Sequence, residues 1–294
     1  MIPLENDSLD SSLAIPQLAL SIWRDDLDKA RKTALEAFKS GYRAIDVASA
    51  QNCEIGLGEA IKEAYASMFL PRKFFFISGC MNYENHGYDS TLKSVESTLK
   101  HLGLNYLDLY LISAPNIPEH LYQESWRALL RLREEGMVRG IGVRDFTVEQ
   151  IEHLIMCSGE KPAVNQIEIH PYRQRSLFCI VLKSLGIQIA ARTPLGSGPA
   201  LSDPLFLKLC FKHRKTPSQI ILRWHIDRGH IALPHAGNTL NLRESLDLYD
   251  FRLALEDMRQ IALLNKSREQ LPRQLGAGSW PAECQAPREI ISYN

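Results

Sequence analysis

The chain has 294 residues, of which 45% are hydrophobic, enough to bury a large core. Its 34 Lys and Arg residues balance 34 Asp and Glu residues, which argues against nucleic acid or an anionic membrane surface as a partner. The N-terminus lacks a signal-peptide pattern, no stretch is apolar enough to span a membrane, and the six cysteines form no CxxC pair. We therefore expect a cytoplasmic protein with reduced thiols, without a membrane segment, whose oligomeric state the sequence leaves open.

Short apolar segments alternate with helical patterns along the chain. Strands are predicted at residues 42–47, 74–78, 107–113, 138–143, 163–169, 187–191, 230–234 and 246–250. Helices are predicted at residues 27–40, 56–66, 90–102, 118–135, 147–157, 176–185 and 217–228. About eight such units predict an α/β fold, a single (β/α)8 TIM barrel domain over residues 1–294. Segment 13–23 is expected to form an N-terminal β-hairpin at the barrel floor, and segment 276–294 a long C-terminal loop.

Polar residues stand at the ends of the predicted strands. In parallel barrels the chemistry takes place at the C-terminal ends of the strands, where loops converge on one face. We therefore expect one ring of side chains around a small-molecule site, made of Asp46, Cys80, Ser113, Arg144, Glu168, Arg192 and His235.

Several long motifs resemble those of the aldo-keto reductases and follow in the same order. They are Gly41–Asp46, Leu102–Ile112, Gly136–Val143, Pro162–Tyr172, Thr193–Gly198 and Thr216–Trp224. The resemblance extends over nearly the whole chain and implies the TIM barrel. It also implies the chemistry of that family, in which NADPH gives a hydride to a carbonyl, a tyrosine beside a lysine–aspartate pair donates the proton, and a histidine orients the substrate.

Three of the four catalytic positions that the resemblance implies are changed. Asp46 matches the family's aspartate, but Gln51 stands at the tyrosine position, Cys80 at the lysine position and Ser113 at the histidine position. An amide has no proton to donate at ordinary pH, and a thiol supplies no positive charge to lower a neighbouring pKa. These substitutions predict that reduction has been lost.

The cofactor positions implied by the resemblance are changed as well. Arg144 and Asp145 replace a Ser-Asn pair, and Arg192 replaces an aromatic ring, while Gln166 is kept. The positions that grip the 2′-phosphate are occupied by His235, Ala236 and Asn241, with Arg243 nearby. Losing two or three charge-assisted contacts, each about 1.5–3 kcal/mol, predicts that no cofactor is used, apart from residual weak NADP binding. The histidines show no ligand spacing, so no metal is expected either.

We interpret this pattern as a cofactor-independent, non-redox step on a small organic substrate in specialised metabolism. Cyclisation, isomerisation and dehydration are equally compatible, so the enzyme would be a cyclase, isomerase or lyase. The predicted catalytic residues are Asp46, Arg192, Gln51, Cys80 and Ser113, with Asp46 as acid or base and Arg192 polarising a carbonyl. The predicted substrate-binding residues are Trp23, Asn82, Arg144, Gln166 and Trp280.

Two alternatives stay open at this point. One is a non-catalytic binding or regulatory protein that keeps only the barrel. The other is an atypical NADP-dependent oxidoreductase with relocated catalytic groups, in which Tyr83 or His86, in the loop after Cys80, donates the proton.

Overall fold

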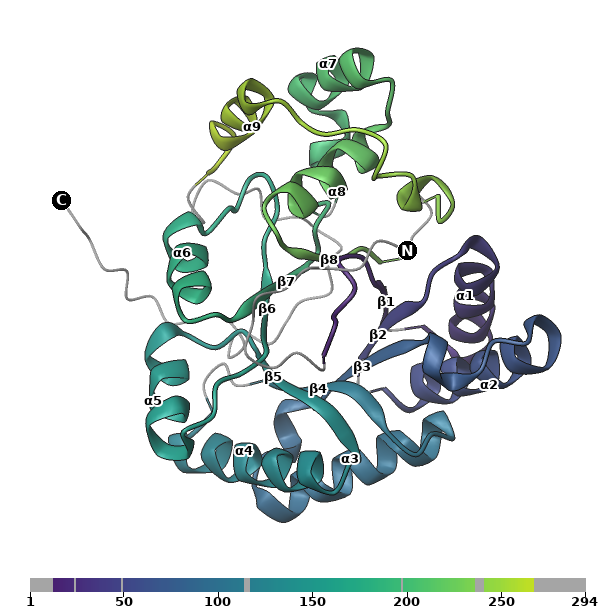
Figure 1. The fold of residues 1–294 in the computed structure, drawn as a ribbon, viewed down its shortest axis with the longest axis vertical. Coiled ribbons are helices and arrows are strands. Elements are labelled where there is room, and N and C mark those ends of the chain that lie inside the picture. Colours follow the sequence, from purple (N-terminus) through teal and green to yellow (C-terminus); the bar gives the residue numbers. More distant parts are fainter. Residues whose placement is uncertain are drawn as a thin grey trace.

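Eight parallel strands form the centre of the molecule (Figure 1). This computed structural model describes residues 13–23, 25–48, 50–113, 117–196, 198–235 and 241–266. The strands follow one another in chain order, each parallel to the next. They are β1 (Leu20–Ile22), β2 (Ala44–Ala48), β3 (Phe76–Cys80), β4 (Leu107–Ser113), β5 (Val138–Arg144), β6 (Val164–Glu168), β7 (Gln188–Arg192) and β8 (Ile231–Leu233). The predicted TIM barrel is confirmed.

The first strand closes the barrel, which differs from the sequence prediction at both ends of the sheet. Segment 13–23 was expected to form a hairpin, but the Ala19 N–H donates to the Ala232 carbonyl at 3.0 Å. The Ser21 N–H likewise donates to Pro234 at 2.9 Å, and β1 pairs with β2 on its other side. The backbone groups of β1 therefore pair with β2 on one side and with the β8 segment on the other. The segment predicted as the last strand, 246–250, instead follows the short 3-10 helix η4 (Glu244–Leu246).

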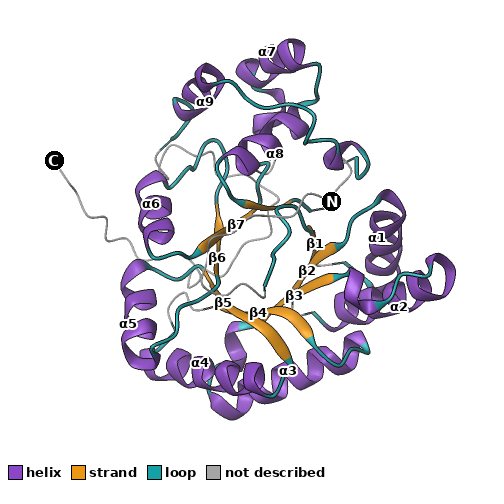
Figure 2. Cartoon of the chain, in the orientation of Figure 1, coloured by secondary structure: helices purple, strands orange, loops and turns teal. Residues whose placement is uncertain are grey.

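Helices surround the strands (Figure 2). They are α1 (Leu27–Ser40), α2 (Gln51–Met68), α3 (Tyr88–Leu102), α4 (Glu119–Glu134), α5 (Val148–Ser158), α6 (Ser176–Ser184), α7 (Pro204–His213), α8 (Pro217–Asp227) and α9 (Leu255–Ala262), with 3-10 turns η1 (Arg72–Phe74), η2 (Tyr83–Asn85) and η3 (Pro199–Ser202). Local signals explain several starts, because capping boxes at Thr147 and Thr216 open α5 and α8. Helices α7 and α9 had not been predicted.

In the part of the chain that the structure describes, two of the three clusters of the hydrophobic core build the barrel, and the third packs α7, α8 and α9 together. The larger one lies between strands and helices and includes Phe38, Trp126 and Leu129. A smaller one fills the barrel interior with Leu109, Val164 and their neighbours, with Ile15 packed among them. No helix among the described residues is long and apolar enough to cross a membrane. The expected C-terminal loop 276–294 lies outside the described residues.

Candidate active site

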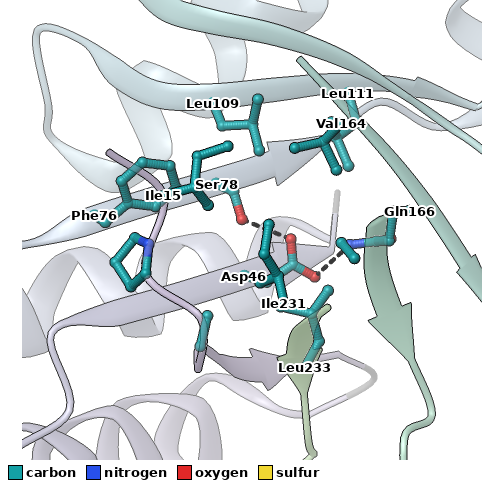
Figure 3. A pocket seen from close by; sticks show the side chains of 13 residues that line it. Ile15, Asp46, Phe76, Ser78, Leu109, Leu111, Val164, Gln166, Ile231 and Leu233 are labelled. Carbon is teal, nitrogen blue, oxygen red and sulfur yellow. Dashed lines mark hydrogen bonds between the residues drawn. The ribbon is translucent and has the colours of Figure 1, made fainter. Parts of the chain in front are cut away.

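Asp46 lies inside the barrel, where its hydrogen-bond partners Ser78 and Gln166 are uncharged (Figure 3). It is only 8% exposed, accepts a hydrogen bond from the Ser78 hydroxyl at 2.7 Å, and accepts another from the Gln166 amide at 3.2 Å. A small cavity of about 20 Å³ adjoins these three side chains and is otherwise lined by apolar groups. Burial raises the pKa of Asp46, although Ser78, Arg144 and Gln166 each act in the opposite direction. The site therefore favours a protonated carboxyl more than water does.

Cys80 and Arg144 lie next to this carboxyl. Cys80 ends β3, is 4% exposed, and has its sulfur 3.7 Å from a guanidinium nitrogen of Arg144. Burial nevertheless raises the pKa of the Cys80 thiol, because it outweighs the attraction of Arg144. The thiol is thus a neutral group in the wall rather than a ready nucleophile. Ser113 ends β4 directly opposite Arg144 on β5.

Charged residues form a network where β5, β6 and β7 end. Arg192 contacts Asp145 with N and O atoms 2.9 Å apart, and Asp145 also lies 3.9 Å from the Arg144 guanidinium. Glu168, the last residue of β6, forms an ion pair with Arg173 and lies 3.6 Å from His170. Burial alone would raise the pKa of Glu168, but His170 and Arg173 outweigh it and lower the pKa to about 2.

Of the two residues proposed as relocated proton donors, His86 has a structural position. One ring nitrogen contacts the Ser113 carbonyl at 2.5 Å and the other the Ser125 hydroxyl at 3.1 Å. The ring is 8% exposed, and burial lowers its pKa. His86 therefore positions the loop after β3 against β4. Tyr83 lies in η2 and is 46% exposed.

The remaining predicted residues are spread more widely. Gln51 is exposed at the first position of α2, and Asn82 is exposed just before η2. Trp23 follows β1 and packs its ring against His235, with ring centroids 5.7 Å apart. Trp280 lies outside the described residues. The structure thus brings Cys80, Ser113, Arg144 and Arg192 together at the ends of β3, β4, β5 and β7, with Asp46 and Gln166 deeper in the barrel.

Sequence reasoning missed three side chains of this site: Ser78, Arg173 and Arg175. Ser78 is two residues before Cys80 on β3, so period-two alternation places both on the interior face. This alternation in the sequence predicts that Ser78 faces the barrel interior. Arg173 and Arg175 lie in the loop between β6 and α6, where no periodicity indicates direction.

The closed parallel barrel with polar groups at the C-terminal strand ends defines an α/β-barrel protein with a site at one mouth. The chain belongs to the Aldo/keto reductase family, whose model matches residues 17–266. It is 36% identical to the glyoxal reductase of Bacillus subtilis (strain 168), covering 88% of this chain and 92% of the relative.

Similar solved structures support this family membership. An aldo/keto reductase from Brucella melitensis has a TM-score of 0.80 and 39% identity, covering 85% of this chain and 95% of that one. The aldo-keto reductase of Bombyx mori, solved in complex with NADP, has a TM-score of 0.79 and 33% identity, covering 86% and 90%.

These similarities correct the functional interpretation drawn from the substitutions. The predicted non-redox cyclase, isomerase or lyase is wrong, because the relatives are named as reductases. The predicted lack of a cofactor is also wrong, because a similar structure contains NADP. The error arose from treating lost contacts as lost binding, although several weak contacts can be replaced at one mouth. The findings favour the alternative of an NADP-dependent oxidoreductase.

Proposed function

We propose that the chain is an NADP-dependent oxidoreductase that reduces a carbonyl group in a small molecule. Its family and the NADP-bound relative from Bombyx mori support the cofactor. The observation in the structure that carries the proposal is the buried carboxyl of Asp46, hydrogen-bonded to Ser78 and Gln166, because its burial favours the protonated form whereas Gln51 has no proton to give.

The side chains at the mouth fit an anionic dinucleotide. The guanidiniums of Arg144 and Arg192 stand at the ends of β5 and β7, and the Gln166 amide lies on β6 between them. Arg144 and Gln166 would hold the nicotinamide end, and the exposed Arg243 before η4 would meet the 2′-phosphate. When bound, NADPH supplies the hydride. These contacts differ from those of the family, with Arg144-Asp145 and Arg192 in place of a Ser-Asn pair and an aromatic ring.

Asp46 takes the role of general acid in this proposal. A protonated carboxyl donates to the oxygen on which negative charge develops as the carbonyl is reduced. The carboxylate left behind is stabilised by the Ser78 hydroxyl, the Arg144 charge and the Gln166 amide, all of which favour the ionised form. The same environment therefore holds the proton before the step and stabilises the charge after it.

We further propose that residues 1–294 form one barrel domain with a cytoplasmic location. The family match over residues 17–266 supports one domain. The described cysteines are all free, which supports a reducing compartment.

Two variants test the proposal together with cofactor binding. NADPH affinity is measured by nicotinamide fluorescence, and turnover by NADPH oxidation with small aldehydes. We expect Asp46→Asn to bind NADPH and lose turnover, while Tyr83→Phe keeps most of it. Retained turnover in Asp46→Asn with loss in Tyr83→Phe would move the acid role to Tyr83. Lack of saturable NADPH binding by the wild-type protein would refute the proposal that NADP is the cofactor.

A further inference from the structure

Four guanidiniums gather at the mouth near the carboxylates of Asp145 and Glu168. Arg144 and Arg192 share Asp145, at N–O distances of 3.9 and 2.9 Å. Arg173 pairs with Glu168. Arg175 is also within electrostatic reach of both carboxylates.

Arg175 is the least compensated member of this cluster. Its side chain is partly buried, yet among the described residues no carboxylate lies within ion-pair distance of it, and its buried Nε has no hydrogen-bond partner. Burial and then repulsion by Arg173 lower the pKa of Arg175 to about 10. A buried guanidinium without a counter-ion is costly, and an incoming anion relieves that cost.

The start of α6 adds to the positive potential at the same point. Arg175 is the residue that precedes the helix, its side chain makes no capping hydrogen bond, and the first turn carries no acidic residue. The partial positive charge of the helix N-terminus is therefore not offset locally. Its contribution is small, but it has the same sign as the guanidiniums.

We propose that Arg173, Arg175 and Arg192 form a subsite for the anionic group, carboxylate or phosphate, of the carbonyl substrate. The inference rests on the proposed function and adds the substrate class: small oxo acids or aldehydes bearing a phosphate, rather than neutral aldehydes. Guanidiniums suit both groups because their planar donors match two oxygens at once. The subsite adjoins the mouth, since Arg192 on β7 pairs in register with Glu168 on β6, two residues beyond Gln166.

Matched pairs of substrates test this selectivity. Succinic semialdehyde is compared with butanal, and glyceraldehyde 3-phosphate with glyceraldehyde, in the wild-type protein and in Arg175→Gln. We expect kcat/KM to favour the charged member of at least one pair at least tenfold in the wild type, and Arg175→Gln to reduce that ratio at least tenfold through KM. Arg131→Gln, which removes an exposed guanidinium paired with Glu135 on α4, is the control and should leave the ratio unchanged. Equal ratios in wild type and Arg175→Gln overturn the proposal.

Two further readouts separate this inference from the proposed function. Calorimetric titration of the cofactor-free protein with succinate or inorganic phosphate should show binding of at least one that Arg175→Gln weakens at least tenfold. Such binding without NADPH oxidation on any substrate would refute the proposed function and keep the anion site. Turnover of neutral and charged aldehydes alike would keep the function and overturn the subsite. If Arg175→Gln weakens NADPH binding instead of the substrate ratio, the guanidiniums serve the cofactor, and the proposal is likewise overturned.

Discussion

Two carboxyl groups on the strands of this barrel have pKa values that are shifted in opposite directions. Asp46 on β2 is surrounded by a hydroxyl and an amide, and burial raises its pKa. Glu168 at the end of β6 is held by Arg173 and His170, which lower its pKa to about 2 despite burial. The two groups differ in their partners. The cation that acts on Asp46 is Arg144, whereas Glu168 forms an ion pair with Arg173 and lies 3.6 Å from His170. Two carboxyl groups whose pKa values are shifted apart can serve one site in different roles, one as an acid and the other as an anion.

Depth in the barrel accounts for this difference. Asp46 lies in the middle of β2, where interior side chains of neighbouring strands are close and mostly apolar. Glu168 is the last residue of β6, where its side chain remains 32% exposed and loop residues can approach it. Charged side chains are therefore concentrated at the strand ends, and Asp46, whose pKa burial raises, lies deeper in the barrel.

The largest effect is expected from Asp46→Asn. If the neutral carboxyl is the acid, this variant loses about 100-fold or more in kcat, because an amide cannot give up a proton. The protonated form is the active one, so wild-type turnover should fall as the pH rises through the pKa of Asp46. Stopped-flow NADPH oxidation across pH measures both effects.

Protein stability gives an independent reading of the same group. A folded pKa above the unfolded value means that Asp46 stabilises the fold at low pH and loses that contribution as the pH rises through its folded pKa. Asp46→Asn should therefore unfold at a higher urea concentration than wild type at alkaline pH, but not at pH values where Asp46 is protonated. A less stable variant at alkaline pH would mean that the fold stabilises the carboxylate, so that the folded pKa of Asp46 is not raised.

Glu168→Gln should have the opposite dependence and a smaller effect on activity. Its pKa shift from 4.5 to about 2 corresponds to ~3 kcal/mol, which partial exposure reduces to about 2 kcal/mol. Because the folded pKa is lowered, this stabilisation exists above the unfolded pKa and disappears as the pH falls through about 2. Urea unfolding should show the deficit at pH 7 and little difference near pH 2. An equal deficit at both pH values would assign it to packing.

Most of the barrel could be predicted from sequence, because buried parallel strands are continuous apolar runs and their helices carry caps. The failures have physical reasons. Leu20–Ile22 is too short to be distinguished from a hairpin arm, since its pairing with β8 is a contact between chain ends. Segment 246–250 has strand-like composition but no partner at a barrel already closed by β1.

The site was predictable in position more than in chemistry. Strand ends placed Cys80, Ser113, Arg144 and Arg192 at one mouth, and the structure agrees. The protonation of Asp46 could not be predicted from the sequence, because it depends on the balance between burial and four partners from other strands. The loop residue Arg175 carried no sequence signal, since a left-handed backbone angle, φ 44°, sets its direction.

Ser78→Ala is expected to have the smallest effect, and it is the most selective test of the difference between Asp46 and Glu168. The Ser78 hydroxyl donates to Asp46 at 2.7 Å and favours its ionised form, so its removal raises the pKa of Asp46 further. The falling limb of the pH–rate profile should then move to higher pH, by roughly half a unit to one unit. Ser94→Ala is the matched control, because it also removes a buried hydroxyl, one that contacts the Tyr110 hydroxyl at 3.0 Å. Both variants should lose about 1 kcal/mol of stability, yet only Ser78→Ala should move the limb. A limb that stays in place, or moves equally in both variants, would show that the titration seen in turnover does not belong to Asp46.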